Sequence, residues 1–323
     1  MSLNNVVVFN KYLYTTLNEL VAQQIELFNA ATRGAIILRN EAFEGDYSDT
    51  TFWQFLSGMV RRRNAYGSGA VSAVTMQMLV DSMVKVAAGT PPINIPPSMF
   101  SWIGQNPEQG GINVARQLAP AMMTDMLNTA VSALAAGLRN VSDVNINVSG
   151  NAGQLAQFNP GTLNQAKALF GDRSSQIAAW VVHSKPMHDY FGNAIANAAQ
   201  LYTYETIAVT TDPFGALFVM SDIPALRIAG SPDNYINLGL VPGAVVVARN
   251  NDFVDNFDTT NGDENLRRTY QAEWTYNLGV KGMSWDKTNG GRSPTSAALA
   301  VGTNWDRTAT SIKDLGGVVL RTL

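Results

Sequence analysis

A single wide apolar stripe over residues 112–138 is the feature that most limits how this chain can fold. Its apolar side chains recur every three or four residues, which is the period of an amphipathic helix. They are Val114, Leu118, Met122, Met126, Leu127, Ala130, Val131, Leu134 and Leu138. At about 1.5 Å per residue this helix would be about 40 Å long, which is unusual inside one small domain. Pro120 lies within the stripe and is expected either to bend the helix or to mark its true start one turn later.

Residues 61–111 have a different pattern, which predicts an extended arm or a long hairpin. The segment opens on Arg61-Arg62-Arg63, after which polar and apolar residues alternate as they do in a strand. It closes with two proline pairs, Pro91-Pro92 and Pro96-Pro97, and a glycine-rich turn. Because a projecting arm cannot bury its apolar face against its own core, we expect this segment to pack on a neighbouring chain.

The remaining patterns mix helix and strand, which predicts an α+β fold. Helical patterns cover 10–31, a start at Phe52, 163–170 with Thr162 as its cap, and 187–199. Strand patterns cover 35–38, 177–182, 206–209, 216–220, 238–248 and 266–280. An acidic loop is expected over 250–264, and the chain then ends in a strand, a glycine bend, a short helix and a final strand. At 323 residues, the chain is expected to form one large domain or a few small ones.

Composition favours a protein that buries much of its surface against other subunits. Charged residues make up only 15% of the chain, against about 25% in typical soluble domains. A neutral polar surface suits an interface, because an unpaired charge is far more costly to desolvate than an amide. The net charge of −3 argues against a dedicated nucleic-acid binder, although not against a protein that surrounds nucleic acid.

The chain contains no cysteine, which excludes a disulfide framework, a thiolate nucleophile and a cysteine-type zinc site. No apolar run has the length of a transmembrane helix. The first residues lack a basic region and a small-residue cleavage site, so the sequence predicts an intracellular product that is not secreted.

No constellation of residues predicts catalysis, so we expect no catalytic, cofactor-binding or metal-binding site. His183 and His188 lack the i, i+4 spacing of a helical zinc pair. With Asp189 or Asp172 they could still form a metal or hydrolase site, and this alternative stays open.

Two charged segments are candidates for contacts between subunits. They are the basic run Arg61, Arg62 and Arg63, and the acidic residues Asp263 and Glu264. The basic run could pair with carboxylates of a neighbouring chain or could simply be solvated. The acidic loop does not have the spacing of a calcium-binding loop.

The order of these elements resembles that of a known family, on five stretches of sequence. They are Gln117–Asn128, Phe170–Ser184, Val219–Pro224, Tyr276–Trp285 and Asn304–Val318. In collinear order they resemble the major capsid proteins of tailed bacteriophages, which have the Hong Kong 97-type capsid fold. The resemblance covers about residues 60–323.

The resemblance implies a particular division of the chain. It would comprise an N-terminal arm (1–60), an extended loop (61–111), a peripheral domain with a spine helix (112–205), a β-rich axial domain (206–267) and a return to the peripheral domain (268–323). Some relatives cross-link subunits through lysine and asparagine side chains. Lys85 lies in the loop, but nothing around it assigns that chemistry.

The resemblance also implies a function that is structural and not enzymatic. Copies of the chain would assemble into hexamers and pentamers of an icosahedral phage head that encloses double-stranded DNA. The chain would form part of the virion after assembly in the host cytoplasm. Its partners would be other copies of itself, a separate scaffolding protein, a portal protein and decoration proteins, with no membrane and no cofactor. A separate scaffold is expected because the chain begins almost directly in the arm.

Three other functions remain open at this point. An encapsulin-like nanocompartment shell would keep the fold but would need a groove that docks cargo. A metal-dependent hydrolase would use His183, His188 and Asp189. A nucleic-acid-binding module would need salt-sensitive affinity, which the acidic balance disfavours.

Overall fold

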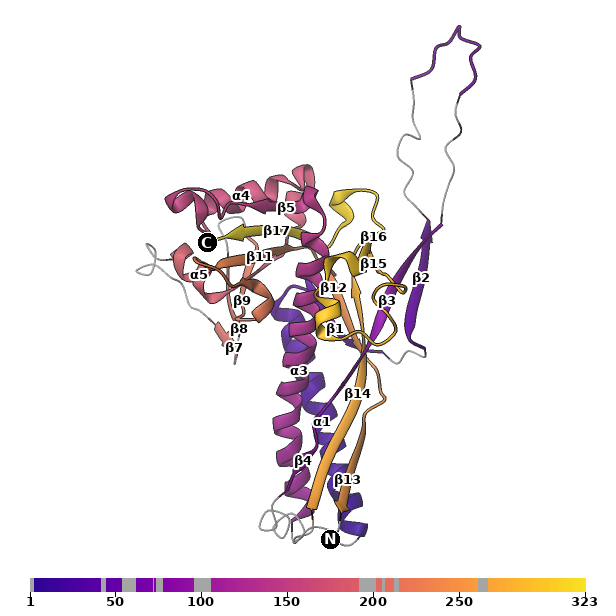
Figure 1. The fold of residues 1–323 in the computed structure, drawn as a ribbon, viewed down its shortest axis with the longest axis vertical. Helices are drawn as coiled ribbons and strands as arrows, with labels where there is room; N and C mark the ends of the chain where they lie inside the picture. The colour runs from indigo at the N-terminus through magenta and orange to yellow at the C-terminus, as the bar shows by residue number, and fades with distance from the viewer. Residues whose placement is uncertain are drawn as a thin grey trace.

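The fold combines a rounded body, a stalk and a projecting hairpin (Figure 1). The computed structural model describes residues 3–41, 45–53, 62–71, 73, 78–95, 106–191, 202–204, 207–211, 215–260 and 267–323. Within these ranges, no helix is long and apolar enough to cross a membrane.

The long central helix α3 (Pro107–Arg139) is confirmed and begins earlier than the sequence predicts. Pro107 stands in the first turn, where the missing amide donor costs nothing, and Glu108 favours the positive end of the helix. Pro120 therefore lies inside the helix, and the alternative in which it marks the helix start is wrong. At the other end, the backbone N–H of Asn140 bonds back to the carbonyls of the last turn.

The N-terminal helix α1 (Leu3–Ala31) packs along α3, and together they form part of the stalk (Figure 1). Leu13, Leu17 and Val21 of α1 are fully buried, which confirms the predicted helix and its apolar face. The two helices approach closely at Gly111, where an added Cβ would lie 2.5 Å from the carbonyl oxygen of Phe9. A side chain at that position would push the helices apart.

A seven-stranded sheet covers one side of α3 and extends along the stalk. Its main path runs β1 (Ile36–Asn40), β12 (Val245–Arg249), β14 (Arg267–Val280), β3 (Met78–Gly89) and β2 (Tyr47–Trp53). β13 (Val254–Thr260) and β4 (Ile93–Asn94) also pair with β14. Only the β1–β12 pair among these is parallel. The predicted long strand is thus confirmed as β14, which organises the whole sheet.

An eight-stranded sheet lies in the rounded body. Its path runs β5 (Asn145–Asn147), β17 (Gly317–Thr322), β11 (Asn234–Leu240), β6 (Ala179–Val182), β9 (Leu217–Met220), β8 (Ile207–Thr211) and β7 (Tyr202–Tyr204), and β10 (Arg227–Ile228) pairs with β11. Helices α4 (Pro160–Ala168) and α5 (Ser184–Phe191) lie in the same body (Figure 1). A small third sheet pairs β15 (Met283–Trp285) with β16 (Trp305–Arg307), and the short helix α6 (Ser296–Leu299) lies between them in sequence.

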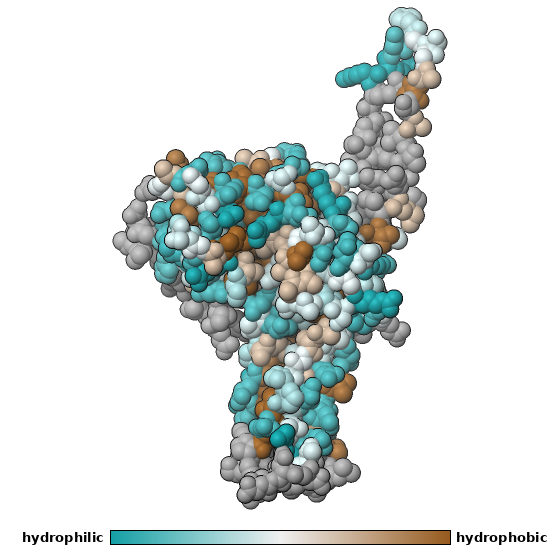
Figure 2. Space-filling view, in the orientation of Figure 1, coloured by the Kyte–Doolittle hydropathy of each residue, from teal (hydrophilic) through white to brown (hydrophobic). Residues whose placement is uncertain are grey.

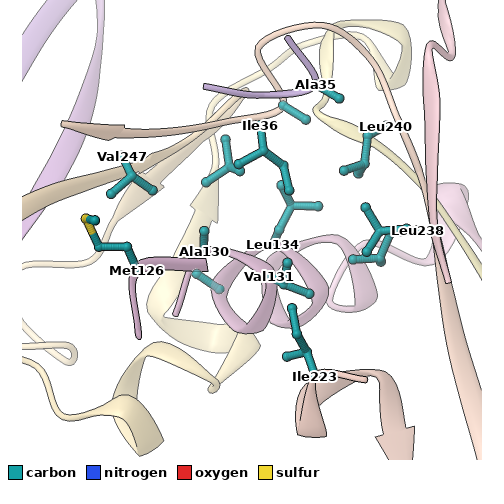
Figure 3. Packing of buried hydrophobic residues seen from close by; sticks show 14 of the residues in the cluster. Ala35, Ile36, Met126, Ala130, Val131, Leu134, Ile223, Leu238, Leu240 and Val247 are labelled. Atoms are coloured by element: carbon teal, nitrogen blue, oxygen red, sulfur yellow. The ribbon is translucent and has the colours of Figure 1, made fainter. Parts of the chain in front are cut away.

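The core is continuous between the two large sheets because α3 contacts both. Figure 3 shows side chains of α3 gathered with side chains from each sheet. Those from α3 are Met126, Ala130, Val131 and Leu134, those from the seven-stranded sheet are Ile36 and Val247, and those from the eight-stranded sheet are Leu238 and Leu240. All of them are buried, so the helix joins the sheets into one hydrophobic cluster.

Several predictions of local structure are wrong. Phe52 does not start a helix but lies in β2, whose backbone pairs with β3. Residues 254–260 of the predicted acidic loop form β13, because β14 offers them a free strand edge. Thr162 is not the helix cap. Asn159 is the cap, and Thr162 completes a capping box because its side-chain oxygen accepts a hydrogen bond from the backbone N–H of Asn159. Residues 192–200 of the predicted helix 187–199 lie outside the described residues.

The predicted domain boundary at 205/206 does not coincide with a change from one sheet to the other. β6 precedes this boundary and β9 follows it, yet the two pair in parallel within one sheet. The chain instead changes sheet in the turn between β11 and β12, which contains Pro242 and Gly243 at φ +71°. The predicted domain division remains a prediction, because strand patterns in the sequence do not show which strands pair.

Candidate assembly surfaces

The hairpin formed by β2 and β3 is the most exposed part of the molecule. The two strands pair from Tyr47 opposite Val84 to Trp53 opposite Met78. Residues 62–71, which lie beyond the paired strands, are all exposed, and the Tyr66 side chain is 99% accessible. A hairpin is present, but its bounds differ from the predicted 61–111: its first strand is Tyr47–Trp53, and residues 107–111 belong to α3. Figure 2 shows polar and apolar residues side by side on its described tip.

The base of the hairpin is fixed to the body by a polar cluster. Asp49 of β2 accepts a hydrogen bond from Ser82 at 2.7 Å and pairs with Lys287. The backbone N–H of Ser82 donates to Ser284 Oγ at 3.1 Å, which ties β3 to β15. The hydrogen bonds from Lys287 and Ser82 lower the pKa of the Asp49 carboxyl. The hairpin therefore leaves the body in a defined direction.

The pKa of the Asp81 carboxyl, on β3, is shifted in the opposite direction to that of Asp49. Burial alone raises the pKa of the Asp81 carboxyl to about 6. The protonated carboxyl contributes to the free energy of folding, and this contribution is fully present below about pH 4. It is lost as the pH rises through about 6, where the buried carboxyl ionises. We therefore expect Asp81→Asn to raise the melting temperature relative to the wild type at pH 8 and to change it little at pH 4.

Asp49→Asn is the matched control on the same hairpin, because the pKa of Asp49 is shifted downward. It should lower the melting temperature at pH 8, and the difference should shrink as the pH falls through the range in which Asp49 is protonated. Thermal melts of Asp81→Asn between pH 4 and pH 8, and of Asp49→Asn from about pH 2 to pH 8, test the pair, because the lowered pKa of Asp49 lies below its ordinary value of 3.8. Equal effects of Asp81→Asn at the two pH values would contradict the assignment to ionisation.

Of the predicted contact residues, the structure describes only Arg62 and Arg63. Arg62 and Arg63 are exposed at the hairpin tip, whereas Arg61, Asp263 and Glu264 lie outside the described residues. In Figure 1, β13 lies in the stalk, away from the hairpin of β2 and β3. A contact between the basic run of one copy and the acidic segment of another remains a prediction.

The histidines do not form a metal centre within the described residues, where no group of three His, Cys, Asp or Glu side chains could hold an ion. His183 Nδ1 lies 3.5 Å from Asp222 Oδ1, and its ring packs against Tyr235 with centroids 5.0 Å apart. Asp189 pairs with Lys185, one turn away on α5. Sequence reasoning missed Asp222 as the partner of His183, because it comes from the segment after β9.

A groove of about 630 Å³ runs between β3, α3, β14 and residues 293–296. Tyr276 lines it and donates to Asp125 Oδ2 at 3.1 Å, with Thr129 Oγ1 also at 3.1 Å from the tyrosine oxygen. Burial raises the pKa of the Asp125 carboxyl, and the hydrogen bond from Tyr276 partly opposes this. Trp274 Nε1, also in the lining, is buried without a partner among the described residues. The sequence could not reveal the groove because its walls come from distant segments.

Comparison with solved structures places this arrangement among phage capsids. The fold matches the capsid of cyanophage Pam1 with a TM-score of 0.53 at 11% identity, covering 86% of this chain and 85% of that chain. A protein of Microbacterium phage Oxtober96 matches at 0.48 and 13% identity, covering 90% of each chain. The capsid of Ralstonia phage GP4 matches at 0.47 and 11% identity, covering 89% of this chain and 87% of that chain. The first match shows the fold, which is the predicted Hong Kong 97-type capsid fold.

Comparison with protein families decides the identity. Residues 5–319 match the Gp13-like family, described as major capsid protein 13-like. The chain belongs to this family. Among curated proteins, no sequence matches it. The resemblance drawn from the sequence is confirmed, and this capsid protein is a component of the shell of a phage virion.

Proposed function

We propose that this capsid protein assembles into hexamers and pentamers that tile an icosahedral head around double-stranded DNA. The observation that carries the proposal is the hairpin of β2 and β3, which projects from the body with an exposed tip. Among the described residues of the hairpin, the large apolar side chains that are more than two fifths accessible are Tyr66, Val71, Met78 and Val80. Packing on another copy would remove this apolar surface from water.

Within the shell, the hairpin of β2 and β3 clasps a neighbouring copy, as predicted for the extended loop, and α3 serves as the spine helix. The eight-stranded sheet forms the axial part, and the seven-stranded sheet with α3 forms the peripheral part, in place of the boundaries drawn from the sequence. Arg62 and Arg63 at the tip pair with carboxylates of another copy, with Asp263 and Glu264 as candidates. The groove beside Tyr276 is a second surface available to a neighbour.

The net charge of −3 supports a shell that encloses DNA without binding a specific sequence. The partners in this proposal are other copies of the chain, a scaffolding protein, a portal protein and decoration proteins. An encapsulin-like shell differs only in its contents, so the enclosed material separates the two functions.

Electron microscopy of the purified chain, with mass photometry on the same sample, tests the proposal. We expect closed shells, or rings of five and six copies, and nuclease-protected DNA inside particles from infected cells. A uniform monomer, both alone and when co-expressed with the other head proteins of the same phage, would contradict self-assembly. Particles filled with protein in place of DNA would favour the nanocompartment. The double variant His183→Ala, His188→Ala should assemble normally, whereas loss of a hydrolytic activity with assembly intact would favour the hydrolase.

A further inference from the structure

A polar pocket of about 370 Å³ lies where α3 ends in the rounded body. Its walls come from the last turn of α3, from strands β5, β11 and β17, and from residues 300–303. The hydrogen-bonding side chains in the lining are Arg139, Asn140, Asn145, Asn147, Thr303 and Arg321, and Ile236, Val301 and Val319 form its apolar part. The lining contains no carboxylate.

The two arginines meet in this pocket because of the strand pairing. Arg139 is the last residue of α3. Arg321 lies on β17 opposite Asn147 of the parallel neighbour β5, so it comes to the same end of the helix. Burial, and then the positive charge of Arg321, lower the pKa of the Arg139 guanidinium. The fold therefore holds two positive charges close enough to repel each other.

Nothing in the described part of the chain neutralises this pair. Arg321 Nε is buried and has no hydrogen-bond partner there. The nearby carboxylate of Asp143 is 3.7 Å from the guanidinium of Arg307, with which it pairs. The negative end of the α3 dipole favours one cation at this place, but the carbonyls of the last turn already accept the N–H of Asn140. Two guanidinium groups that share one pocket without a counter-charge repel each other, and a ligand that supplies negative charge would remove this repulsion.

We propose that this pocket binds an oxyanion, a phosphate or carboxylate group, held between Arg139 and Arg321. Guanidinium groups present paired N–H donors that match the oxygens of such groups. The amide groups of Asn145 and Asn147 and the hydroxyl of Thr303 are further donors in the lining. This inference goes beyond the proposed function and does not depend on it, because an isolated subunit has the same pocket.

The same chemistry has two possible sources. One is a free phosphate ion, and the other is an aspartate or glutamate side chain of a second copy in the shell. A free ion would be retained by both subunits and shells. A carboxylate from a second copy would be displaced by phosphate, which would weaken the contact between copies.

The test is thermal unfolding of the full chain in inorganic phosphate and in chloride at equal ionic strength. We expect saturating phosphate to raise the melting temperature of the wild type by about 2 °C or more. Arg139→Gln and Arg321→Gln should each remove most of this shift. Arg227→Gln is the control, because Arg227 is an exposed arginine that pairs with Asp233 outside the pocket, and it should keep the full phosphate shift.

In chloride, each pocket variant should melt at or above the wild-type temperature, because it relieves the repulsion between the arginines. A purely structural role for either arginine would instead lower the melting temperature in both salts. No phosphate shift in the wild type, or an equal shift in the double variant Arg139→Gln, Arg321→Gln, would overturn the proposal. Arg139 is more exposed than Arg321, so its variant keeps the test valid if Arg321→Gln does not fold.

Assembled shells distinguish the two sources. If the oxyanion is a free ion, phosphate raises the melting temperature of wild-type shells as it does that of subunits. If it is a carboxylate of a second copy, phosphate lowers the yield of wild-type shells, and Arg321→Gln shells form poorly in either salt. Both results support an oxyanion pocket.

Discussion

Deleting residues 65–70 from the hairpin tip should abolish or strongly reduce shell formation and leave the subunit folded. All six residues are exposed and lie beyond the paired part of β2 and β3, so they contribute little to the stability of their own chain. The melting temperature of the subunit should change little, as expected for surface changes worth about 0.5 kcal/mol or less. Particle counts by electron microscopy and a thermal melt of the same preparation measure the two effects.

A point variant sharpens this prediction. Tyr66→Ala removes the most exposed aromatic side chain of the tip, and aromatic side chains often dominate an interface, at about 2 kcal/mol or more each. We expect at least a tenfold weaker association, which corresponds to about 1.4 kcal/mol. Leu155→Ala is the matched control, because Leu155 is also exposed (63%) but lies outside the hairpin. Normal shells from both the deletion and Tyr66→Ala would show that the tip is not the clasp.

Replacing Leu134 by aspartate should unfold the subunit. Leu134 is 1% exposed and lies where α3 contacts both sheets (Figure 3). Truncating such a residue to alanine already costs about 2–5 kcal/mol, and aspartate adds an unpaired buried charge. This loss approaches the total stability of a typical domain, about 5–15 kcal/mol. Circular dichroism and the soluble fraction after expression report the result.

Two variants define how specific this effect is. Leu134→Met keeps the volume and should cost less than about 1.5 kcal/mol. Leu127→Asp changes a residue of the same stripe that is only partly buried, so it should destabilise the subunit less than Leu134→Asp. A soluble Leu134→Asp subunit that melts cooperatively would show that this part of α3 is not the centre of the core.

The elements that could be predicted from the sequence are those with a strong local period. The stripe from Val114 to Leu138 indicates α3 because each apolar residue has its partner one turn away in the same segment. The long strand β14 was likewise recognisable from its own sequence. Low charge and the absence of a catalytic constellation favoured a structural protein, and the order of the elements resembled the capsid family.

Other elements depended on partners that no local pattern contains. β2 and β13 are strands because β3 and β14 offer them hydrogen bonds. The placement of β11 and β12 in different sheets follows from pairings with β6 and β17 on one side and with β1 and β14 on the other.

The sequence by itself therefore determined the α+β class, the long helix and the exposed hairpin, because side-chain periodicity is a property of neighbouring residues. Only the tertiary structure decided where the sheets divide the chain, which carboxylate meets His183, and that Arg139 and Arg321 share a pocket. The physical reason is that strand register and long-range packing bring together residues far apart in sequence, and the free energy of these contacts depends on both partners at once.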